Sequence, residues 1–403
     1  MVDTSDIVIA GGGLVGSALA HAIALDGHDV TVMDAIAARY PIHKSFDGRA
    51  YALTFGSTRM LEAIGIWNRV KEKAQPILEI KVSQGHSGHG PTSSPLHFDH
   101  AEIEEGPMGY VIEDRHLRLA FREASGETGS IDFINDEIVA QQANEKCMTL
   151  GLASGRRATC KLLVGCDGKK SGTATRAGIK RTGWDYRQTA LVASIEHDLP
   201  HHGIAHQFFM PPGPLAILPL PGNTSSIVWS ENQATGERFT ALSDADFIEV
   251  LKPRFGDFLG DIRLKGKRFS YPLSLLIANR IVSDRVALAG DAAHNIHPLA
   301  GQGMNLGLRD AATLAEVLSR AKRRGEDISS SAVLARYQQC RSFENVRMAM
   351  ATDIINKLFS NDVFPLKIIL DIGMGMVGRM PMLRREIIRE AAGLGGDLPY
   401  LMR

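Results

Sequence analysis

The residues whose types and spacing could do chemistry lie late in the chain, at positions 290–318. This stretch has the sequence GDAAHNIHPLAGQGMNLGLRDAATLAEVL, with an acid at Asp291 and a glycine on each side of Gln302. Glycines let backbone approach a ligand closely, because no Cβ stands in the way. An apolar run precedes the stretch, and apolar residues recur at helical spacing from Met304. The predicted order is therefore strand, loop and helix.

A loop of this kind suits a flat ligand that becomes anionic. The helix from Met304 would point its unpaired backbone N–H groups, and the positive end of its dipole, toward the loop. A reduced flavin has these properties, because its negative charge lies at N1 and the C2 carbonyl.

A second ligand pattern lies at the start of the chain, where the apolar segment DIVIA precedes Gly11-x-Gly13-x-x-Gly16. An Ala/Leu-rich helix is expected over residues 14–25, and a second strand ends on Asp34, 18 residues after Gly16. This spacing is close to the roughly 20 residues typical of a dinucleotide-binding βαβ unit. The glycines would place a pyrophosphate on the helix N-terminus, and Asp34 would bind the ribose hydroxyls.

Two further patterns are not expected to bind ligands. Another GxGxxG begins at Gly373, but Pro381 interrupts the helix that should follow, and the chain ends before a second strand. Four histidines form two HxxH pairs, but the intervening Gly, Ser and Pro residues favour a solvated loop over a metal site. These are His86, His89, His97 and His100.

Three sequence segments resemble those of the aromatic-ring hydroxylases of ubiquinone biosynthesis. They are GDAAH, HPLAGQGMNLGLRD and, at residues 213–220, GPLAILPL. That family is a branch of the FAD-dependent class A monooxygenases, and the resemblance covers nearly the whole chain. It implies an α/β fold: a Rossmann-like FAD/NAD(P)-binding domain with three layers (ββα), an inserted antiparallel β-sheet substrate domain and a helical C-terminal tail.

The domains are expected to be discontinuous. Strand-like segments between positions 189 and 230, separated by Pro and Gly turns, predict the inserted antiparallel sheet. The apolar face of that sheet could roof a pocket over the flavin, although core packing explains the same residues equally well. The expected bounds are 1–75, 105–180 and 280–340 for the FAD-binding domain, 76–104 and 181–279 for the substrate domain, and 341–403 for the helical C-terminal segment.

The resemblance also implies a set of FAD-binding residues. Asp291 would bind the ribityl hydroxyls, and the residues from Pro298 onward would line the isoalloxazine ring. Arg49 would lie along the flavin, or else be a surface ion-pair residue. The full expected site consists of Gly11, Gly13, Gly16, Asp34, Arg49, Asp167, Gly168, Gly290, Asp291, Pro298, Ala300, Gly301, Gln302, Gly303, Met304 and Asn305.

No catalytic side chain is expected, because the cofactor would perform the chemistry. The implied reaction uses NAD(P)H to reduce FAD, and a flavin C4a-hydroperoxide then hydroxylates a polyprenylated phenol with oxygen from O2. The sequence assigns no clear role to His294. His297, next to Pro298, could face the substrate, but hydrogen bonding to loop backbone is the favoured interpretation for His297.

One departure from the family pattern concerns the reductant. The family's arginine three residues after Ser171 is replaced by Ala174, and Arg176 is displaced by two positions. The sequence therefore leaves open NADH, NADPH or a separate reductase. It also does not encode which ring position is hydroxylated.

Two alternatives remain open. The chain could be another flavin oxidoreductase of the same fold, such as a polyprenyl reductase; the lysine and Trp-rich motif of halogenases is not found. It could also be a non-catalytic subunit that keeps the fold and holds a ubiquinone-biosynthesis complex together.

Composition bounds the partners. The 403 residues include 44% hydrophobic residues, and the 45 basic and 45 acidic residues cancel, so no nucleic-acid partner is expected. The acidic N-terminal segment lacks signal-peptide character, which indicates a cytoplasmic protein. The apolar segment 358–370, followed by arginines that include Arg384 and Arg385, suggests peripheral contact with the inner face of a membrane; packing against the first domain is the alternative.

Overall fold

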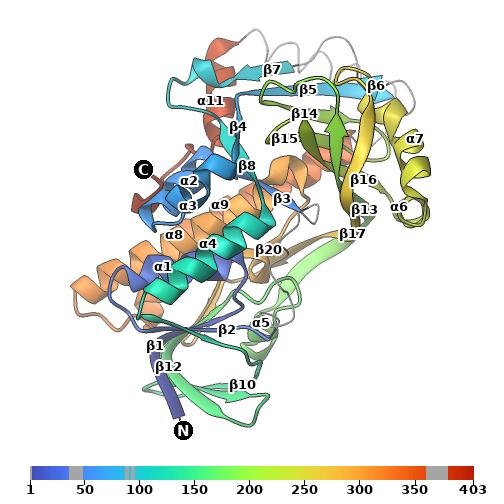
Figure 1. Cartoon of the computed structure of the whole chain (residues 1–403). Helices are drawn as coiled ribbons and strands as arrows, with labels where there is room; N and C mark the ends of the chain where they lie inside the picture. The colour runs from blue at the N-terminus through green and yellow to red at the C-terminus, as the bar shows by residue number, and fades with distance from the viewer. Residues whose placement is uncertain (1, 36–48, 87–89, 92–95, 360–379) are drawn as a thin grey trace.

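The structure is a computed structural model of the chain, and it describes residues 2–35, 49–86, 90–91, 96–359 and 380–403 (Figure 1). The second GxGxxG motif, at Gly373, and most of the apolar segment 358–370 lie outside these residues. The same holds for His89, which belongs to the first HxxH pair.

An eight-stranded sheet forms the lower part of the molecule in Figure 1. Its centre is parallel, since β1 pairs with both β12 and β2 in parallel register. The central strands are aliphatic and buried on both faces, as parallel strands covered by helices are. The strands are β1 (Val2–Ala10), β2 (Val30–Met33), β9 (Ile131–Ile134), β10 (Ile138–Ala143), β11 (Met148–Leu152), β12 (Arg157–Gly165), β18 (Val282–Ser283) and β19 (Val286–Leu288).

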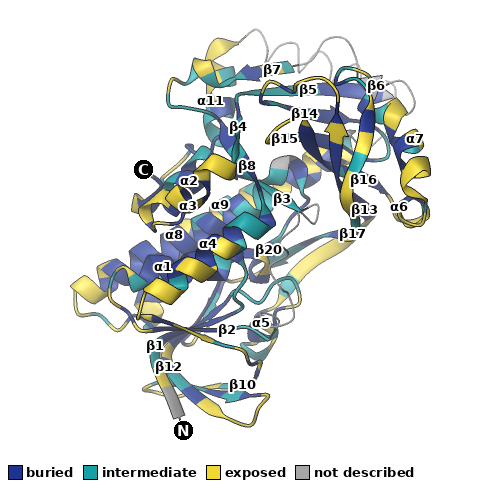
Figure 2. Cartoon of the chain, in the orientation of Figure 1, coloured by how far each residue is buried: buried dark blue, intermediate teal, exposed yellow. Residues whose placement is uncertain are grey.

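Helices α1 and α8 pack together at the core of this part, and Figure 2 shows much of both as buried. Their approach is close, because a Cβ added at Gly307 would lie 2.7 Å from the Val15 side chain and 3.2 Å from the Cα of Gly290. The helices of this part are α1 (Leu14–Ala24), α2 (Phe55–Ala63), α3 (Trp67–Val70), α4 (Asp114–Glu127), α5 (Gly172–Arg176), α8 (Gln302–Arg323) and α9 (Ser331–Phe359).

A nine-stranded sheet forms the upper part, with β17, β13, β16, β15 and β14 as antiparallel neighbours. The sequence predicted an antiparallel sheet, but β5 pairs with β14 in parallel. The strands are β5 (Glu79–His86), β6 (Gly90–Pro91), β7 (Leu96–Asp99), β13 (Arg181–His197), β14 (Ile204–Phe209), β15 (Leu215–Leu220), β16 (Thr224–Asn232), β17 (Ile262–Ala278) and β20 (His294–Asn295).

Helices α6 (Gln233–Thr240) and α7 (Asp244–Phe255) cover this second sheet, and Trp229, Phe247 and Phe255 pack in the core between them. A smaller sheet has the order β3 (Ala50–Thr54), β8 (Gly109–Glu113) and β4 (Gln75–Ile77). The chain ends with α11 (Pro381–Ala391) and a short 3-10 turn. Helix α9 begins at Ser331, before the predicted start of the helical tail.

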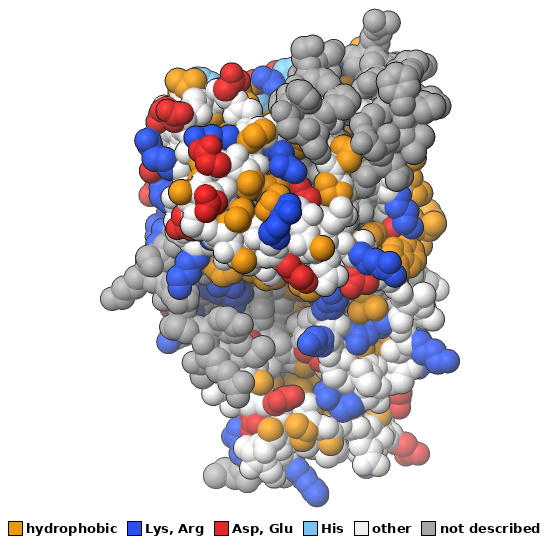
Figure 3. Space-filling view, turned by 90° about the vertical axis from the view of Figure 1, so that its right-hand side faces the viewer, with side chains coloured by type: hydrophobic (Ala, Val, Ile, Leu, Met, Phe, Trp, Pro, Cys, Tyr) orange, Lys and Arg blue, Asp and Glu red, His pale blue; other side chains and the backbone are white. Residues whose placement is uncertain are grey.

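Two surface properties follow from the composition. Basic and acidic side chains are interspersed on the face drawn in Figure 3, as their equal numbers predict. Within the described part of the chain, no helix combines the length and the hydrophobicity that a membrane crossing requires.

Strand β20 matters for function because it joins the two parts. Its residues His294 and Asn295 pair with Ile277 and Leu276 of β17, so the loop of residues 290–301 lies where the part built on the eight-stranded sheet meets the nine-stranded sheet.

Candidate functional site

The glycines of the turn between β1 and α1 differ in whether the fold itself requires them. Gly11 has φ +101°, and a Cβ there would lie 2.4 Å from the carbonyl oxygen of Cys166. A Cβ at Gly16 would lie 2.0 Å from the oxygen of Gly11, so both glycines are needed by the fold itself. A Cβ at Gly13 would have no atom of the structure within 4 Å. The fold therefore leaves open space at Gly13.

Gly13 is also the N-cap of α1, and no side chain caps this helix end in the structure. The N–H groups of the first turn and the positive end of the helix dipole therefore face the open space. Asp34 lies beside the turn, where its Oδ2 accepts a hydrogen bond from the Gly12 N–H at 2.9 Å. An anionic group with a hydroxylated neighbour, such as a nucleotide pyrophosphate and ribose, matches this arrangement.

The Asp167-Gly168 pair lies against the glycine turn, since a Cβ at Gly11 would be 3.0 Å from the Cα of Asp167. Both carboxylate oxygens of Asp167 accept hydrogen bonds from its own loop: Oδ1 from the Ser171 hydroxyl at 2.5 Å and Oδ2 from the Thr173 N–H at 2.9 Å. Asp167 therefore shapes the loop. At the neighbouring Gly168 (φ +77°), which is partly exposed, a Cβ would have no atom within 4 Å.

Arg176, the displaced arginine, is engaged within the protein. Its Nε donates to Oε1 of Gln141 at 3.1 Å, and its guanidinium lies over Gly172, 2.6 Å from where a Cβ would be. Burial lowers the pKa of Arg176, an effect that Asp167 and Glu137 oppose.

The Gly290-Asp291 turn lies next to α1, because a Cβ at Gly290 (φ +63°) would be 3.3 Å from Val15. The Asp291 side chain reaches solvent, but desolvation by the surrounding protein raises the pKa of its carboxyl, while His294 and Lys169 lower it. The structure thus brings together three segments that lie nearly the whole chain apart: the glycine turn, Asp167-Gly168 and Gly290-Asp291.

Helix α8 begins at Gln302, two residues earlier than Met304, and its N-cap is Gly301 with φ +64°. The Asn305 side chain is used inside the protein: its Oδ1 accepts from the Thr54 N–H at 2.9 Å, and its Nδ2 donates to the oxygens of Ala52 at 2.8 Å and Gly301 at 3.0 Å. Asn305 therefore fixes the start of α8 against β3, and only its backbone remains for a ligand.

Arg49 forms an ion pair with the buried carboxylate of Asp114, with 3.4 Å between Nη2 and Oδ2. The ion-pair alternative that the sequence offered for Arg49 is therefore present, and its contact with FAD stays a prediction. The described histidines of the HxxH pairs are also bound locally: His97 to Glu79 at 2.8 Å and His100 to the Leu78 oxygen at 2.9 Å.

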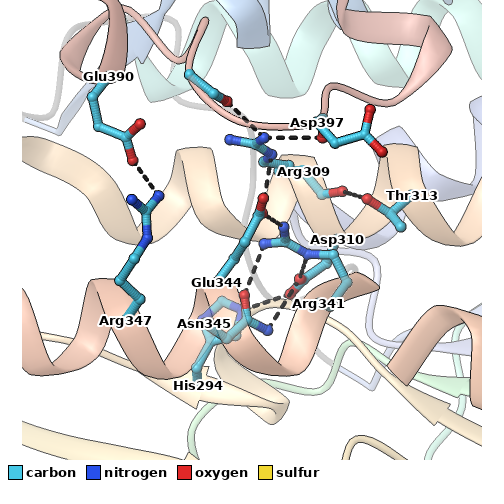
Figure 4. A network of polar contacts seen from close by, with 11 residues as sticks. His294, Arg309, Asp310, Thr313, Arg341, Glu344, Asn345, Arg347, Glu390 and Asp397 are labelled. Atoms are coloured by element: carbon cyan, nitrogen blue, oxygen red, sulfur yellow. Dashed lines mark hydrogen bonds and ion pairs between the residues drawn. The ribbon is translucent and has the colours of Figure 1, made fainter. Parts of the chain in front are cut away.

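Sequence reasoning missed the role of Asp310, a buried acid on α8. Its Oδ2 accepts from the Gly290 N–H at 3.0 Å and lies 2.5 Å from Nε2 of His294, and its Oδ1 accepts from Nε of Arg341 at 2.7 Å. Figure 4 shows Asp310 between His294 and Arg341, with Asn345 beside it. Desolvation opposes ionisation, but His294 and Arg341 hold the pKa of Asp310 well below its usual range.

A signal for this network was present in the sequence. Asp310 occupies a position of the helix between the apolar residues Leu306, Ala311 and Leu314, so its side chain had to be buried. A buried charge requires partners, which here come from η3 (Gly290–Ala292), β20 and α9.

The expectation that loop backbone satisfies His297 is wrong for the described residues. Its neighbour in the loop, His294, is bound by the Asp310 carboxylate. His297 is 1% exposed, and neither of its ring nitrogens has a hydrogen-bond partner among the described residues. The sequence could not show this, because the surroundings of His297 come from distant segments.

Comparison with known proteins agrees with this architecture. The chain matches the FAD binding domain family over residues 4–351. It is 42% identical to the ubiquinone hydroxylase UbiL of Rhodospirillum rubrum, covering 99% of this chain and 92% of that protein. It is 32% identical to the 3-demethoxyubiquinol 3-hydroxylase of Escherichia coli, covering 97% and 99% respectively.

Among solved structures, p-nitrophenol 4-monooxygenase PnpA from Pseudomonas putida superimposes with a TM-score of 0.79, covering 98% of this chain and 99% of that one at 20% identity. At that identity the likeness supports the fold alone. The family match and the identities to the two hydroxylases go further. The chain belongs to the FAD-dependent aromatic-ring monooxygenases, in the group that contains the ubiquinone hydroxylases.

Proposed function

We propose that this chain hydroxylates the aromatic ring of a polyprenylated phenol in ubiquinone biosynthesis, with FAD as cofactor and O2 as the source of oxygen. The observation that carries the proposal is the meeting of three glycine-containing segments beside an uncapped helix, in a chain 42% identical to a ubiquinone hydroxylase over 92% of that protein. The printed names of the relatives support the substrate class.

We infer that FAD lies along the sixteen expected residues, from the glycine turn to the start of α8. Bound FAD supplies the activation of O2, and the chain supplies binding and orientation. The turn at Gly11, Gly13 and Gly16 would bind the pyrophosphate, with Asp34 on the ribose. Asp291, whose side chain is exposed, would bind the ribityl hydroxyls, and the N-terminus of α8 would face the isoalloxazine ring.

The dipole of α8 would stabilise negative charge on the reduced ring by about 0.3–2 kcal/mol. The positions that would line the ring are Pro298, Ala300, Gly301, Gln302, Gly303, Met304 and Asn305, with Arg49, Asp167, Gly168 and Gly290 nearer the rest of the cofactor.

The decisive experiment supplies purified, FAD-bearing protein with a farnesyl-substituted phenol, O2 and NADH or NADPH, and identifies the product by mass spectrometry. We expect one added oxygen, and consumption of nucleotide that rises with substrate. A yellow protein that forms no hydroxylated product under any reductant would favour the non-catalytic subunit. Reduction of a prenyl double bond would favour a polyprenyl reductase.

The ring position can be assigned in cells. The gene is placed in strains that each lack one ring hydroxylase, and the accumulated quinone intermediates are identified. Rescue of one strain assigns the position, whereas rescue of none contradicts the enzymatic proposal.

The reductant is tested separately, because Ala174 replaces the family's arginine and Arg176 is bound to Gln141. Stopped-flow mixing of the oxidised enzyme with each nucleotide, in the presence of substrate, measures flavin bleaching directly. Bleaching by either nucleotide identifies the reductant, and its absence with both shows that a separate reductase is needed.

We also propose that the protein meets its substrate at a membrane surface. A polyprenyl tail is held in a bilayer by about 0.8 kcal/mol for each buried CH2. Helix α9 exposes apolar side chains on one face, namely Phe343 (75% exposed), Val346 (42%), Met350 (56%) and Ile354 (49%). At the start of α11, Met382 is 85% exposed. This exposed apolar face, rather than the arginines alone, supports contact with lipid.

A further inference from the structure

Three buried polar groups meet without hydrogen-bond partners where the loop after β20 contacts β13 and α9. These are both ring nitrogens of His297, the hydroxyl of Tyr186 and Oδ1 of Asp353, and none of them has a partner in the described part of the chain. His297 is 1% exposed and Asp353 is 7% exposed. Four unpaired polar atoms therefore lie in one buried region.

This clustering is selective. Leaving a buried polar group unpaired costs about 1–3 kcal/mol, so folded proteins rarely retain one without a use for it. His28 and His294 each leave one ring nitrogen unpaired, whereas His297 leaves both. Two other buried histidines use both of their ring nitrogens. His201 binds the Leu220 oxygen at 2.8 Å and the Gly203 N–H at 3.0 Å, and His197 binds the Leu199 oxygen at 2.8 Å and the Ser225 hydroxyl at 3.0 Å.

The three side chains lie near one another, since Asp353 acts electrostatically on both Tyr186 and His297. The rings of Tyr186 and His297 are 5.2 Å apart, with an interplanar angle of 78°. Oδ2 of Asp353 accepts from Nζ of Lys357 at 2.8 Å, which leaves Oδ1 as the unpaired oxygen. Burial, and then the nearby Asp353 carboxylate, raise the pKa of Tyr186, although the two groups do not form a hydrogen bond of normal geometry.

The protonation state of His297 suits a hydrogen-bond acceptor. Burial lowers the pKa of His297 to about 4, and Asp353 acts in the opposite direction. The imidazole is therefore neutral near neutral pH, with one nitrogen that accepts and one that donates.

Apolar side chains surround this polar group. Leu275, Ile296, Leu306 and Ala349 form a buried cluster, and the partly buried Tyr186, Ile277 and Met348 pack against it. The cluster therefore reaches the surface at these last three side chains, of which Met348 is unbranched and adaptable. A ligand that matches the region is a flat apolar ring carrying a hydroxyl group.

We propose that His297, Tyr186 and Asp353 form the polar end of the substrate site, where His297 accepts the hydrogen bond and then the proton of the substrate's phenolic hydroxyl. This inference rests on the proposed function and assigns the residues that recognise its phenol. His297 is then a catalytic residue, and Asp353 is a positioning residue that directs the second ring nitrogen.

The proton step balances with hydroxylation. As a ring carbon forms its bond to the incoming oxygen, the phenolic oxygen gives electron density to the ring and its O–H bond breaks. That proton moves to the neutral nitrogen of His297, and the Asp353 carboxylate stabilises the resulting imidazolium. When aromaticity returns, the ring carbon gives its own proton to water and the phenolic oxygen takes a proton back from His297. One C–H bond has become C–OH. One oxygen atom of O2 is now in the product, and the other leaves as water with the two electrons that the reductant of the proposed function supplies.

The test compares a farnesyl-substituted phenol with its methyl ether, which has the same ring and tail but no O–H. Dissociation constants for the FAD-bearing holoenzyme are measured from the change in flavin absorbance. We expect wild-type protein to bind the phenol about 10-fold or more tightly than the ether, the value of a good hydrogen bond to a buried site. In His297→Phe this ratio should fall to about 1.

The matched control is His201→Phe, which removes a buried histidine whose nitrogens are both used. We expect His201→Phe to lower Tm by several degrees and to keep the phenol-to-ether ratio. His297→Phe removes only unpaired polar atoms from the ligand-free protein, so its Tm should stay the same or rise. Asp353→Asn should lower kcat by about 10-fold or more with a smaller change in KM, because it acts on the charged imidazolium.

The outcomes separate the inference from the proposed function. If wild-type protein hydroxylates the phenol and His297→Phe keeps the wild-type ratio, the assignment of His297 is wrong and the function stands. A large fall in the Tm of His297→Phe, with an unchanged ratio, would show that the group is structural. If wild-type protein hydroxylates no prenylated phenol, the proposed function fails first.

Discussion

At the scale of single residues, variants at Gly13 and Gly16 distinguish a loss of cofactor binding from a loss of folding stability. A Cβ at Gly13 would have no atom of the described structure within 4 Å, whereas one at Gly16 would overlap the Gly11 oxygen. We therefore expect Gly13→Val to fold, with Tm within a few degrees of wild-type apoprotein, but to purify without flavin. Gly16→Ala should lose stability as well as flavin. Visible absorbance and thermal unfolding measure the two effects, and flavin retained by Gly13→Val would contradict the pyrophosphate assignment.

Asp291 is the carboxylate proposed to bind the ribityl chain. Its side chain reaches solvent and has no structural ion pair in the described structure, so its removal should cost the fold little. We expect Asp291→Ala to weaken FAD binding about 10-fold or more, because hydrogen bonds to a charged group contribute about 1.5–3 kcal/mol each. Titration of apoprotein with FAD gives the dissociation constant, and an unchanged value would remove Asp291 from the site.

The spacing of the sequence predicts these residues as ligand contacts, but it does not predict the surroundings of His297, for a physical reason. Glycines that permit a turn or a close approach act within a few residues, so their spacing alone carries the information. The environment of His297 is built by Tyr186 and Asp353, which belong to other elements. A single-sequence pattern does not contain such contacts, and the sequence analysis therefore favoured the wrong environment.

At the scale of elements, Asp310 joins α8 to η3, β20 and α9. Removing one member of a buried ion pair leaves an uncompensated charge and costs about 3–5 kcal/mol. We expect Asp310→Ala and Arg341→Met each to lower the free energy of unfolding by about 3–5 kcal/mol. The double variant should lower it by less than the sum of the two single changes. Chemical denaturation measures all three variants.

The exposed pair of Arg347 and Glu390, 2.5 Å apart, is the matched control for this cycle. Arg347→Met should cost about 1 kcal/mol or less, because surface ion pairs contribute little. Strict additivity of Asp310→Ala and Arg341→Met would contradict the network. Weakened FAD binding in Asp310→Ala would additionally show that its bond to the Gly290 N–H orients the neighbouring Asp291.

Element bounds were predictable where burial is periodic. The sequence predicts a helix over residues 244–259. Helix α7 starts at Asp244 but ends at Phe255, because Gly256 (φ +85°) follows as its C-cap. Strand β13 is longer than predicted and begins at Arg181 rather than Thr189. Its first half is polar and largely exposed and pairs with β17 through backbone hydrogen bonds, which no hydrophobic pattern reports.

At the scale of the whole molecule, buried histidines predict sensitivity to acid. Burial, with a smaller effect of Lys81, lowers the pKa of His206 from an ordinary 6.5 to about 4, and burial lowers that of His297 to about 4. Between about pH 4 and pH 6.5, the unfolded chain therefore binds more protons than the folded chain. Stability is therefore full above about pH 6.5 and is lost as pH falls toward 4.

His206→Gln tests this dependence away from the proposed site, since His206 packs against Phe258 with their rings 4.5 Å apart. Urea midpoints are measured between about pH 7 and pH 4.5. We expect the midpoint of wild type to fall across this range and that of His206→Gln to fall less steeply. Parallel curves would show that His206 is not a source of the acid sensitivity.

The exposed apolar face of α9 is the surface proposed to contact a bilayer. Arg384 forms an ion pair with Glu102 at 2.8 Å, and Arg389 pairs with Glu105, so charge reversal at Arg384 would also break a contact within the protein. The cleaner variant replaces Phe343, Met350 and Ile354 together by serine. These side chains are 49–75% exposed, so stability and flavin content should change little.

We expect wild-type protein to sediment with vesicles of phosphatidylethanolamine and phosphatidylglycerol, and the triple variant to remain largely in solution. Turnover of a long-tailed substrate in such vesicles should fall, while turnover of a farnesyl-substituted phenol in detergent should not, because the variant alters access to lipid and not the site. Phe133→Ser, which replaces a 46% exposed apolar residue on the distant strand β9, is the control and should bind vesicles normally. Equal sedimentation of the triple variant and wild type would contradict the role of α9, since each exposed apolar side chain contributes by the area that it buries in the lipid.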